Sequence, residues 1–428
     1  MKDEVNQMAV LEPRPYLLVN KIRHYPWGTK GEDAFIPCLL GIEAQPGIPY
    51  AELWIGAHDT APSDVVRKYS LEPLNQLISE SPSEILGEAT CRNFQDTLPF
   101  LLKVLSVGEA LSLQVHPNKD QAKSLNETDP NHYPDSNHKP ELAIALDFLT
   151  ALVGFKSFDE ILCTLEEYRE IASFIGNEVC QELKDLQNPS CSKQQDAVRS
   201  MYSTMVVRSE NCEDKLMEVL GQLDRRFKES AYIRPKGEEE LFRDLRKKYT
   251  GADVGLLSIF FLNLIQLKKG QWIYIKPGTP HAYLRGNIVE CMANSDNVVR
   301  IGLTPKYRDA QTLAKILDYE LGPPIPEDTS SSETFTYKIP GVSEFQVARW
   351  KLGTDAERSK TIESKLRILL ITEGEICISW CVGSERKKEI FQRGQSILIP
   401  AFLKCCTITA KDSAELFTVE IPKVPASE

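Results

Sequence analysis

The chain has 428 residues, 42% of them hydrophobic and 26% charged, which excludes a disordered, collagen-like or coiled-coil protein. At roughly 150 residues per domain, this length predicts about three domains. The 50 Lys and Arg residues are outnumbered by 61 Asp and Glu residues, so the net charge is −11. Nucleic acids and anionic membranes bind basic faces, and we therefore expect neither as a partner.

The remaining composition favours a cytoplasmic protein. The most apolar run, Val254 to Leu267, is shorter than the ~20 residues that a membrane-spanning helix needs. The first residues include early acidic side chains and lack the apolar stretch of a signal peptide. The 11 cysteines follow no disulfide or zinc-finger spacing, which predicts reduced thiols. We expect no membrane partner and a monomer.

The first part of the chain, residues 15–155, has the pattern of short β-strands separated by turns. The clearest strands are expected at 98–107 and at 111–117, where apolar and polar residues alternate. The pattern changes after residue 155. A capping box from Ser157 to Glu160 and apolar residues at helical spacing predict a helical insertion over 156–251.

Strand patterns return after the insertion. We expect strands from Gly255 and at 270–278, then a helix at 310–319. The segment 321–333, with adjacent prolines, acids and a serine run, is the expected linker. Beyond it, strands are expected at 366–380, 395–401 and 415–422. The predicted fold class is therefore mainly β with an α insertion, and the predicted domains are 15–155 with 252–320, 156–251, and 334–428.

Two segments resemble each other within the chain. Gly270-Gln-Trp-Ile-Tyr-Ile and Gly394-Gln-Ser-Ile-Leu-Ile both begin with a Gly-Gln turn, continue as an alternating strand and reach a proline turn. Coincidence is one explanation, and two sheets of one barrel or jelly-roll architecture is the other. Only the first copy continues to a histidine, His281, and no histidine follows it.

Several polar side chains are expected to share strand faces, because residues two apart on a strand point to the same side. This places Gln114 beside His116, Lys139 beside Glu141, and Tyr283 beside His281. Nitrogen and oxygen ligands from three separate strands would form a site for a divalent cation. The alternative is that the two histidines are hydrogen-bonded core residues and the glutamate is a surface acid. The four candidate metal ligands are Gln114, His116, Glu141 and His281.

The segment from His281 to Lys306 intersperses charged residues with small and apolar ones. A solvated loop would not need Met292, Ala293 or Val299 between its charges. The pattern instead indicates a cleft, in which charged groups act on a ligand. Lys139, Arg300 and Lys306 would supply the cations that an anionic substrate requires.

Five motifs together resemble the type I phosphomannose isomerases, zinc enzymes of the cupin superfamily. The two long ones are Tyr133-Pro-Asp-Ser-Asn-His-Lys-Pro-Glu141 and His281 to Lys306, and the resemblance covers residues 20–320 most strongly. It implies two cupin-type jelly-roll β-barrels plus a helical domain, with the metal in the first barrel and none in the second. It also implies one zinc per chain, held by Gln114, His116, Glu141 and His281, with Arg300 as the catalytic arginine. The sugar-phosphate pocket would be lined by Ser112, Lys139, Tyr283, Glu290, Asp296 and Lys306. Ile301 departs from the family, which usually has alanine there.

The implied reaction interconverts mannose 6-phosphate and fructose 6-phosphate through a cis-enediol, and feeds GDP-mannose synthesis. The group that moves the proton is left open among Lys139, Glu290, Asp296 and a zinc-bound water. Two other functions stay open at this point. Two histidines and a carboxylate also describe a non-haem iron oxygenase, and a metal-stabilised sugar-binding cupin would need no catalysis.

Overall fold

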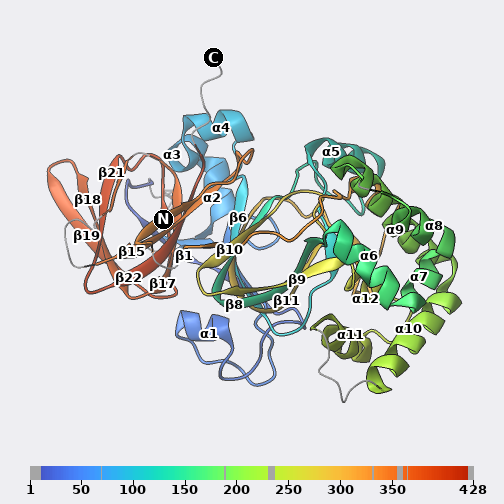
Figure 1. Cartoon of the computed structure of the whole chain (residues 1–428). Helices are drawn as coiled ribbons and strands as arrows, with labels where there is room; N and C mark the ends of the chain where they lie inside the picture. Colours follow the sequence, from blue (N-terminus) through green and yellow to red (C-terminus); the bar gives the residue numbers. More distant parts are fainter. Residues whose placement is uncertain are drawn as a thin grey trace, which may run out of the picture. The chain divides into compact units, whose positions relative to one another are not determined.

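The computed structural model describes residues 11–68, 70–187, 189–229, 237–329, 332–353, 360–363 and 365–422 (Figure 1). The chain divides into two compact units, one formed by Met1–Arg23, Gly31–Lys103 and Ser331–Glu428, the other by His24–Lys30 and Val104–Ser330. This division differs from the predicted domains, because residues 31–103 group with the C-terminal strands and the helical segment groups with the metal-site strands. The boundary between the two units at 330/331 falls inside the expected linker. Residues 330 and 331 lie outside the described ranges, and so do the first ten residues.

The first unit contains two antiparallel sheets whose facing sides share an apolar core that includes Trp350, Ile378 and Ile397. The N-terminal strand lies in the larger sheet, where Tyr16 is paired with Leu398. The larger sheet has the order β14 (Thr334–Tyr337), β15 (Gln346–Leu352), β22 (Ala414–Glu420), β17 (Arg367–Glu373), β20 (Ser396–Ile399), β1 (Tyr16–Val19), β4 (Asp64–Val66) and β5 (Leu71–Pro73). The smaller has the order β16 (Lys360–Glu363), β21 (Cys405–Ala410), β18 (Glu375–Val382) and β19 (Glu385–Gln392).

This unit also contains helices that the sequence reading missed. Strands alone were expected over 15–155, and that expectation is wrong here. Leu74, Leu77 and Ile78 recur at helical spacing and are buried on one face of a short helix. Short helices with only three apolar positions give a weak periodic signal. Besides the strands of the two sheets above, this unit contains the helices and strands β2 (Lys21–Arg23), α1 (Phe35–Leu40), β3 (Glu52–Gly56), α2 (Leu74–Glu80), α3 (Pro82–Leu86) and α4 (Glu88–Phe94).

The second unit is built on a long central strand, β8 (Glu141–Phe155), which pairs antiparallel with three others. Its partners are β9 (Leu262–Lys268), β10 (Gln271–Ile275) and β11 (His281–Ala293). Strand β7 (Leu113–Val115) pairs with β11 on one side and with β12 (Val299–Gly302) on the other. The sheet also includes β6 (Phe100–Val107) and β13 (Glu327–Asp328). The mainly β fold class, with cupin-type barrels and a helical part, is confirmed.

The helical segment packs against strands β7 and β8. Its predicted start is confirmed, since Ser157 Oγ accepts from the Glu160 amide at 3.3 Å and Glu160 Oε2 accepts from the Ser157 amide at 3.0 Å. Its apolar side chains share one core with Leu113 and Val115 of β7. The helices of this unit are α5 (Lys119–Thr128), α6 (Phe158–Glu167), α7 (Arg169–Ile175), α8 (Asn177–Lys184), α9 (Cys191–Asn211), α10 (Glu213–Glu229), α11 (Gly237–Lys248), α12 (Gly255–Ser258) and α13 (Ala310–Ile316). None of the helices in the described ranges has the length and apolar character of a membrane span.

Two expected strands are interrupted. The strand expected from Gly255 begins only at Leu262, because Gly255–Ser258 form the short helix α12. The Asp253 carboxylate accepts from the Gly255 amide at 2.8 Å where this helix begins. The run 366–380 is divided into β17 and β18 at Gly374, whose φ is 79°. A Cβ there would lie 2.0 Å from the Ser413 carbonyl oxygen, so only glycine fits this turn.

The two Gly-Gln segments have the same local structure, one in each unit. Gly270 and Gly394 have φ values of 83° and 84°. Gln271 Oε1 accepts from the Lys268 amide at 2.8 Å, and Gln395 Oε1 accepts from the Gln392 amide at 2.7 Å. A strand of an antiparallel sheet follows in both cases. The internal similarity therefore reflects a repeated structural element rather than coincidence.

Candidate metal centre and active site

The candidate ligands come together where three strands of the second unit begin or end. His116 directly follows β7, Glu141 is the first residue of β8, and His281 is the first residue of β11. In the pairing of β11 with β7, His281 lies opposite Gln114. The strand ends thus bring side chains from distant parts of the sequence to one place.

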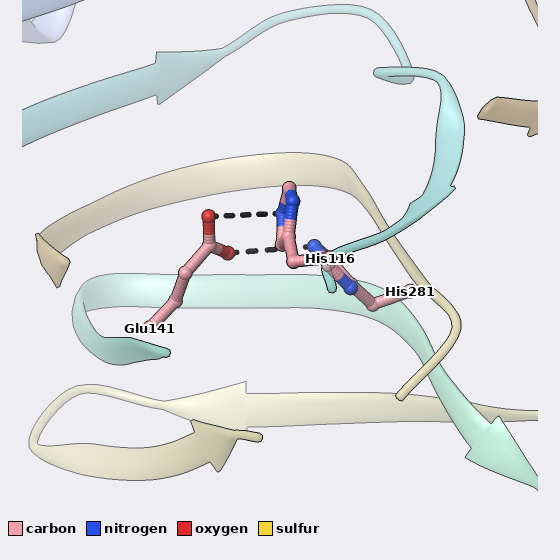
Figure 2. A group of neighbouring side chains, drawn as sticks. All are labelled: His116, Glu141 and His281. Carbon is pink, nitrogen blue, oxygen red and sulfur yellow. Dashed lines mark ion pairs between the residues drawn. The ribbon is translucent and has the colours of Figure 1, made fainter. Parts of the chain in front are cut away.

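Three of these residues form a compact buried group (Figure 2). His116 Nε2 lies 3.2 Å from Glu141 Oε1, and His281 Nε2 lies 3.4 Å from Glu141 Oε2. Each of the three residues is at most 1% exposed, so the alternative in which Glu141 is a surface acid is wrong. His116 Nε2 and Glu141 Oε2 have no hydrogen-bond partner, which is costly for buried polar atoms. Convergent imidazole nitrogens and a carboxylate fit a divalent metal such as zinc.

Hydrogen bonds on the far side of each imidazole determine which nitrogen faces this group. His116 Nδ1 donates to the Asn297 carbonyl oxygen at 2.8 Å, and His281 Nδ1 donates to the Thr279 carbonyl oxygen at 3.0 Å. Both Nε2 atoms are therefore available as lone-pair donors. Burial lowers the pKa of His116 to about 4, which keeps this imidazole neutral at pH 7.

The carboxylate of the group is held in its charged form by neighbours. Lys139 Nζ lies 3.4 Å from Glu141 Oε1, which confirms that these two residues share a face. Burial alone would raise the pKa of Glu141, but the charge of His116 when it is protonated, together with that of Lys139, holds this pKa well below its usual value. Glu141 thus presents an anionic carboxylate next to the buried side chain of Lys139.

Gln114 and Ser112 lie at the edge of the group. Gln114 Nε2 is 3.5 Å from His281 Nε2, and Ser112 Oγ donates to Gln114 Oε1 at 3.2 Å. The nitrogen and oxygen of a glutamine amide exchange places on a 180° rotation, and this rotation would turn the oxygen toward a metal. The fourth predicted ligand is therefore in contact with His281 of this group.

Arg300 extends the same sheet face on the other side of Gln114. It lies opposite Gln114 in the pairing of β12 with β7. Burial lowers the pKa of its guanidinium, although an arginine retains its charge at pH 7. The neighbouring Ile301 is 2% exposed and belongs to the apolar core shared with the helical segment. The residue that departs from the family pattern therefore packs into that core.

The other predicted pocket residues divide into buried and exposed ones. Tyr283 and Glu290 are buried on β11. Burial raises the pKa of Tyr283 well above its usual value, and the charges of Glu141 and Glu290 add to this effect. Asp296 and Lys306 are exposed, in the loops before and after β12. In the described part of the chain, no side-chain contact joins Lys306 to the histidine–glutamate group.

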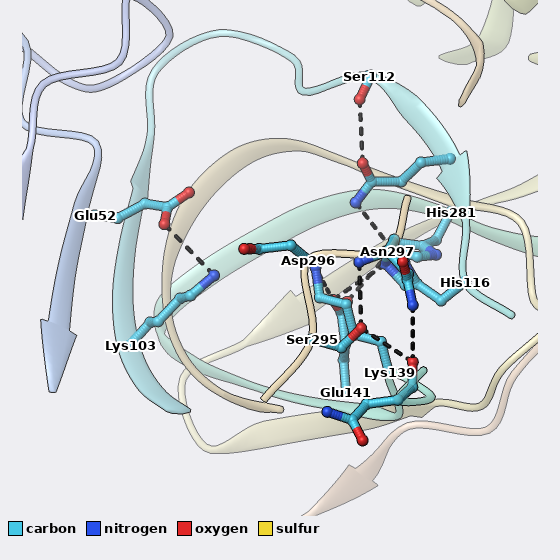
Figure 3. Close-up of polar contacts among 12 residues, drawn as sticks. Glu52, Lys103, Ser112, His116, Lys139, Glu141, His281, Ser295, Asp296 and Asn297 are labelled. Carbon is cyan, nitrogen blue, oxygen red and sulfur yellow. Dashed lines mark hydrogen bonds and ion pairs between the residues drawn. The ribbon is translucent and has the colours of Figure 1, made fainter. Parts of the chain in front are cut away.

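Sequence reasoning missed the residues that support this group from behind. Figure 3 shows Asn297 and Ser295 next to His116, and they contact Asp135 of the first long motif. Asp253 likewise accepts from the Leu303 amide at 2.9 Å, which anchors the loop after Arg300. The only sequence signal for Asp253 was an acidic residue just before an apolar run.

Figure 3 also draws an ion pair of the other unit, in which Lys103 Nζ lies 3.6 Å from a carboxylate oxygen of Glu52.

Fold and site define a metal-binding protein of cupin-type β-barrels with a buried centre of two histidines and a glutamate. The family model described as phosphomannose isomerase type I, catalytic domain, matches residues 16–158. The chain is 36% identical to mannose-6-phosphate isomerase of Rattus norvegicus, over 85% of this chain and 88% of the relative. It is 33% identical to mannose-6-phosphate isomerase 2 of Arabidopsis thaliana, over 92% and 91%. The chain belongs to the type I phosphomannose isomerase family.

Solved structures agree with this assignment. An arginine-to-alanine mutant of phosphomannose isomerase from Salmonella typhimurium matches with a TM-score of 0.80 at 28% identity, over 95% of this chain and 99% of that one. A mannose 6-phosphate isomerase bound with zinc and yttrium matches with a TM-score of 0.77 at 27% identity, with the same coverage. The similarity therefore extends through the helical segment and the C-terminal strands, where the sequence resemblance is weak.

Proposed function

We propose that this chain interconverts mannose 6-phosphate and fructose 6-phosphate, with one zinc ion held by Gln114, His116, Glu141 and His281. The observation that carries the proposal is the buried group of two histidines and a glutamate, in a chain of this family. We further propose that the chain is a cytoplasmic monomer. The mannose 6-phosphate that it forms would feed the synthesis of GDP-mannose.

The bound zinc would act as a Lewis acid toward the sugar oxygens at C1 and C2. Arg300 would donate hydrogen bonds to the oxygen that gains negative charge when the proton at C2 is removed. Its position opposite Gln114 and its half-buried guanidinium support this role. A fixed positive charge at that position lowers the barrier without any proton transfer from the arginine.

Proton transfer between C1 and C2 requires one further group, either a zinc-bound water or a side chain of this chain. Lys139, Glu290 and Asp296 are the candidate side chains. Lys139 and Glu290 are buried, and Lys139 is in contact with Glu141, whereas Asp296 is exposed. Separate substitutions of the three, followed by exchange of the C2 proton with solvent, identify the group.

The phosphate end of the substrate would bind Ser112 and Lys306. Lys306 is exposed and its ammonium makes no ion pair within the described residues, so it is available to an anion. Ser112 Oγ lies next to the metal group through its hydrogen bond to Gln114. Tyr283 would line the floor of the pocket beside His281, at a ring-centroid distance of 5.9 Å.

The comparisons support this activity over the two alternatives. An iron oxygenase and a non-catalytic sugar-binding cupin both fit two histidines and a carboxylate, but neither accounts for membership in an isomerase family. The solved relative with zinc also favours zinc over iron. A non-catalytic protein would have no use for Arg300 next to the ligand group.

The test is a coupled assay that follows fructose 6-phosphate formation from mannose 6-phosphate. The purified chain is measured as isolated, after chelation, and after zinc is restored. We expect activity to disappear on chelation and to return with zinc. Absence of isomerisation by the zinc-loaded protein would contradict the proposal, and metal-dependent oxygen consumption would favour the oxygenase.

A further inference from the structure

We infer that Asp135 and Asn297 are positioning residues that hold the His116 imidazole in its metal-binding tautomer and orientation. This inference rests on the proposed metal-binding function of the centre and adds two residues to it. Asn297 contacts His116 through its backbone carbonyl oxygen, and Asp135 contacts the side chain of Asn297. Both act through the carbonyl oxygen that accepts the Nδ1 proton of His116.

His116 needs support from another segment because it lies one residue beyond the end of β7. Its backbone carbonyl accepts from the Gly278 amide at 2.8 Å, but this bond leaves the ring free to rotate. The ring is held through Nδ1, which donates to Asn297, 181 residues away in sequence. His281 differs, since its Nδ1 donates to Thr279, only two residues away. The orientation of His116 therefore depends on where the segment 295–297 is placed.

The side chain of Asn297 fixes its own carbonyl. This side chain is fully buried, and its Nδ2 donates to the Asp135 carbonyl at 2.7 Å, to Asp135 Oδ1 at 3.1 Å and to the Asn137 carbonyl at 3.1 Å. All three partners are acceptors, so an aspartate at 297 would set a carboxylate against them. Asn297 Oδ1 is buried without a hydrogen-bond partner. The chain retains this unfavourable burial because the amide nitrogen is required.

Asp135 joins the two long motifs at this point. Its Oδ1 accepts from Ser295 Oγ at 2.8 Å and its Oδ2 accepts from the Asp296 amide at 2.8 Å. Oδ1 also accepts from the Asn137 amide at 2.9 Å, which closes the turn that leads to Glu141. One carboxylate thus fixes the segment before Glu141 against the segment before Arg300.

The expected effect concerns metal affinity. Loss of a partner that orients a ligating histidine typically weakens metal binding about 10- to 100-fold. We expect this loss for Asn297→Asp and Asp135→Asn, since each reverses a donor–acceptor pair. Ser295→Ala removes a single hydroxyl from the network, and we expect a smaller loss of about two- to fivefold on the same principle.

The matched control is a second Asp–Asn pair in the same unit. Asn287 Nδ2 donates to Asp147 Oδ2 at 2.6 Å, and the Asn287 amide donates to Asp147 Oδ1 at 3.1 Å. This pair also joins distant segments, 140 residues apart against 162 for the first pair, but it is exposed, and no bond joins it to a histidine of the described residues. Asp147→Asn therefore removes the same kind of contact without touching the metal group.

The experiment measures binding of zinc, by competition with a chromophoric chelator, and the visible absorption of the cobalt-substituted protein. We expect weaker zinc binding and a shifted cobalt band for Asn297→Asp and Asp135→Asn, with wild-type values for Asp147→Asn. Equal zinc affinity in all variants, or an equal loss in Asp147→Asn, would overturn the inference. If Asn297→Asp and Asp135→Asn fail to fold, the zinc affinity and the cobalt absorption band of Ser295→Ala decide.

This design separates the inference from the proposed function. Metal binding is measured without substrate. A wild-type protein that binds cobalt but does not isomerise mannose 6-phosphate contradicts the proposed function alone. Variants that isomerise and bind zinc as tightly as the wild type contradict only the role of Asp135 and Asn297.

Discussion

Arg300 and Gln114 lie directly opposite each other in the antiparallel pairing of β12 with β7. Residues opposite each other in such a pair point to the same face of the sheet, about 5 Å apart. Gln114 is also opposite His281 in the pairing of β7 with β11. Three adjacent strands therefore carry His281, Gln114 and Arg300 in a row on one face, so that Arg300 lies one strand beyond the candidate ligand Gln114.

This arrangement predicts the kinetics of Arg300→Ala. Because the guanidinium would stabilise charge that develops only in the transition state, kcat should fall about 10²- to 10³-fold with little change in KM. Steady-state kinetics with mannose 6-phosphate measure both constants. Arg300→Lys is the control, since it retains the charge but loses the planar group of donors. A raised KM with kcat intact would instead assign Arg300 to binding of the substrate phosphate.

We predict one zinc per chain. Within the described residues, a single group of His, Cys, Asp and Glu side chains is close enough to hold a metal, and it lies in the second unit. In the first unit the corresponding Gly-Gln strand is followed by Pro400 and Ala401, and no histidine. Elemental analysis should give one zinc for the wild type and none, or nearly none, for His281→Ala. Two zinc ions per chain would contradict this assignment.

Acid should destabilise the metal-free protein through His116. Burial lowers its pKa in the folded state from 6.5 to about 4. Between these values the unfolded chain binds a proton that the folded chain does not, so stability is lost as the pH falls from 6.5 toward 4. The loss is on the order of 3 kcal/mol when complete. Urea unfolding of chelator-treated protein at pH 7 and pH 5 measures it, and His116→Gln should show a smaller difference between the two.

Zinc should be released over the same range, because a histidine must be deprotonated to bind a metal. Zinc retained by the protein is measured after equilibration at each pH and gel filtration. We expect the midpoint of release to lie below pH 6.5, since burial lowers the pKa of His116 and keeps its imidazole neutral. Full retention at pH 3 would contradict ligation by histidine.

The cysteines of the helical segment should be dispensable for activity. Cys163 and Cys191 are exposed, Cys212 is partly buried, and none of the three is near the metal group. Their substitution by serine should leave kcat unchanged. Cys180 is 4% exposed, so Cys180→Ala should lower stability by about 1 kcal/mol while activity is retained. Inactivation of a folded single variant would show that chemistry extends into this segment.

Local patterns predicted the parts of this structure that depend on neighbours in sequence. Alternation placed Lys139 with Glu141, and the structure brings these two residues together. Alternation also placed Gln114 on the face of the candidate site, where it contacts His281. The capping box at Ser157 marked the start of α6 within one residue. Each of these signals spans only a few residues, and a period of two or a helical period is readable at that length.

Long-range pairing could not be predicted in the same way. The N-terminal strand β1 pairs with β20, almost 380 residues away, and this pairing groups residues 31–103 with the C-terminal strands. Nothing in the pattern of a three- or four-residue strand specifies its partner. The role of Asn297 could not be predicted for a similar reason, because it depends on contacts with Asp135, which is 162 residues away in the sequence.

The repeated Gly-Gln turn gives this chain an internal reference. The amides of Lys268 and Gln392 are bonded to the equivalent glutamine side chains at nearly equal distances. Temperature, denaturant and solvent act on both turns alike, whereas only the first leads through β10 to a candidate metal ligand, His281. Hydrogen exchange at the two amides can therefore be compared within one molecule. Slower exchange at Lys268 than at Gln392 after zinc is added would report the stabilisation of one barrel by its metal, with the other barrel as an unliganded standard in the same tube.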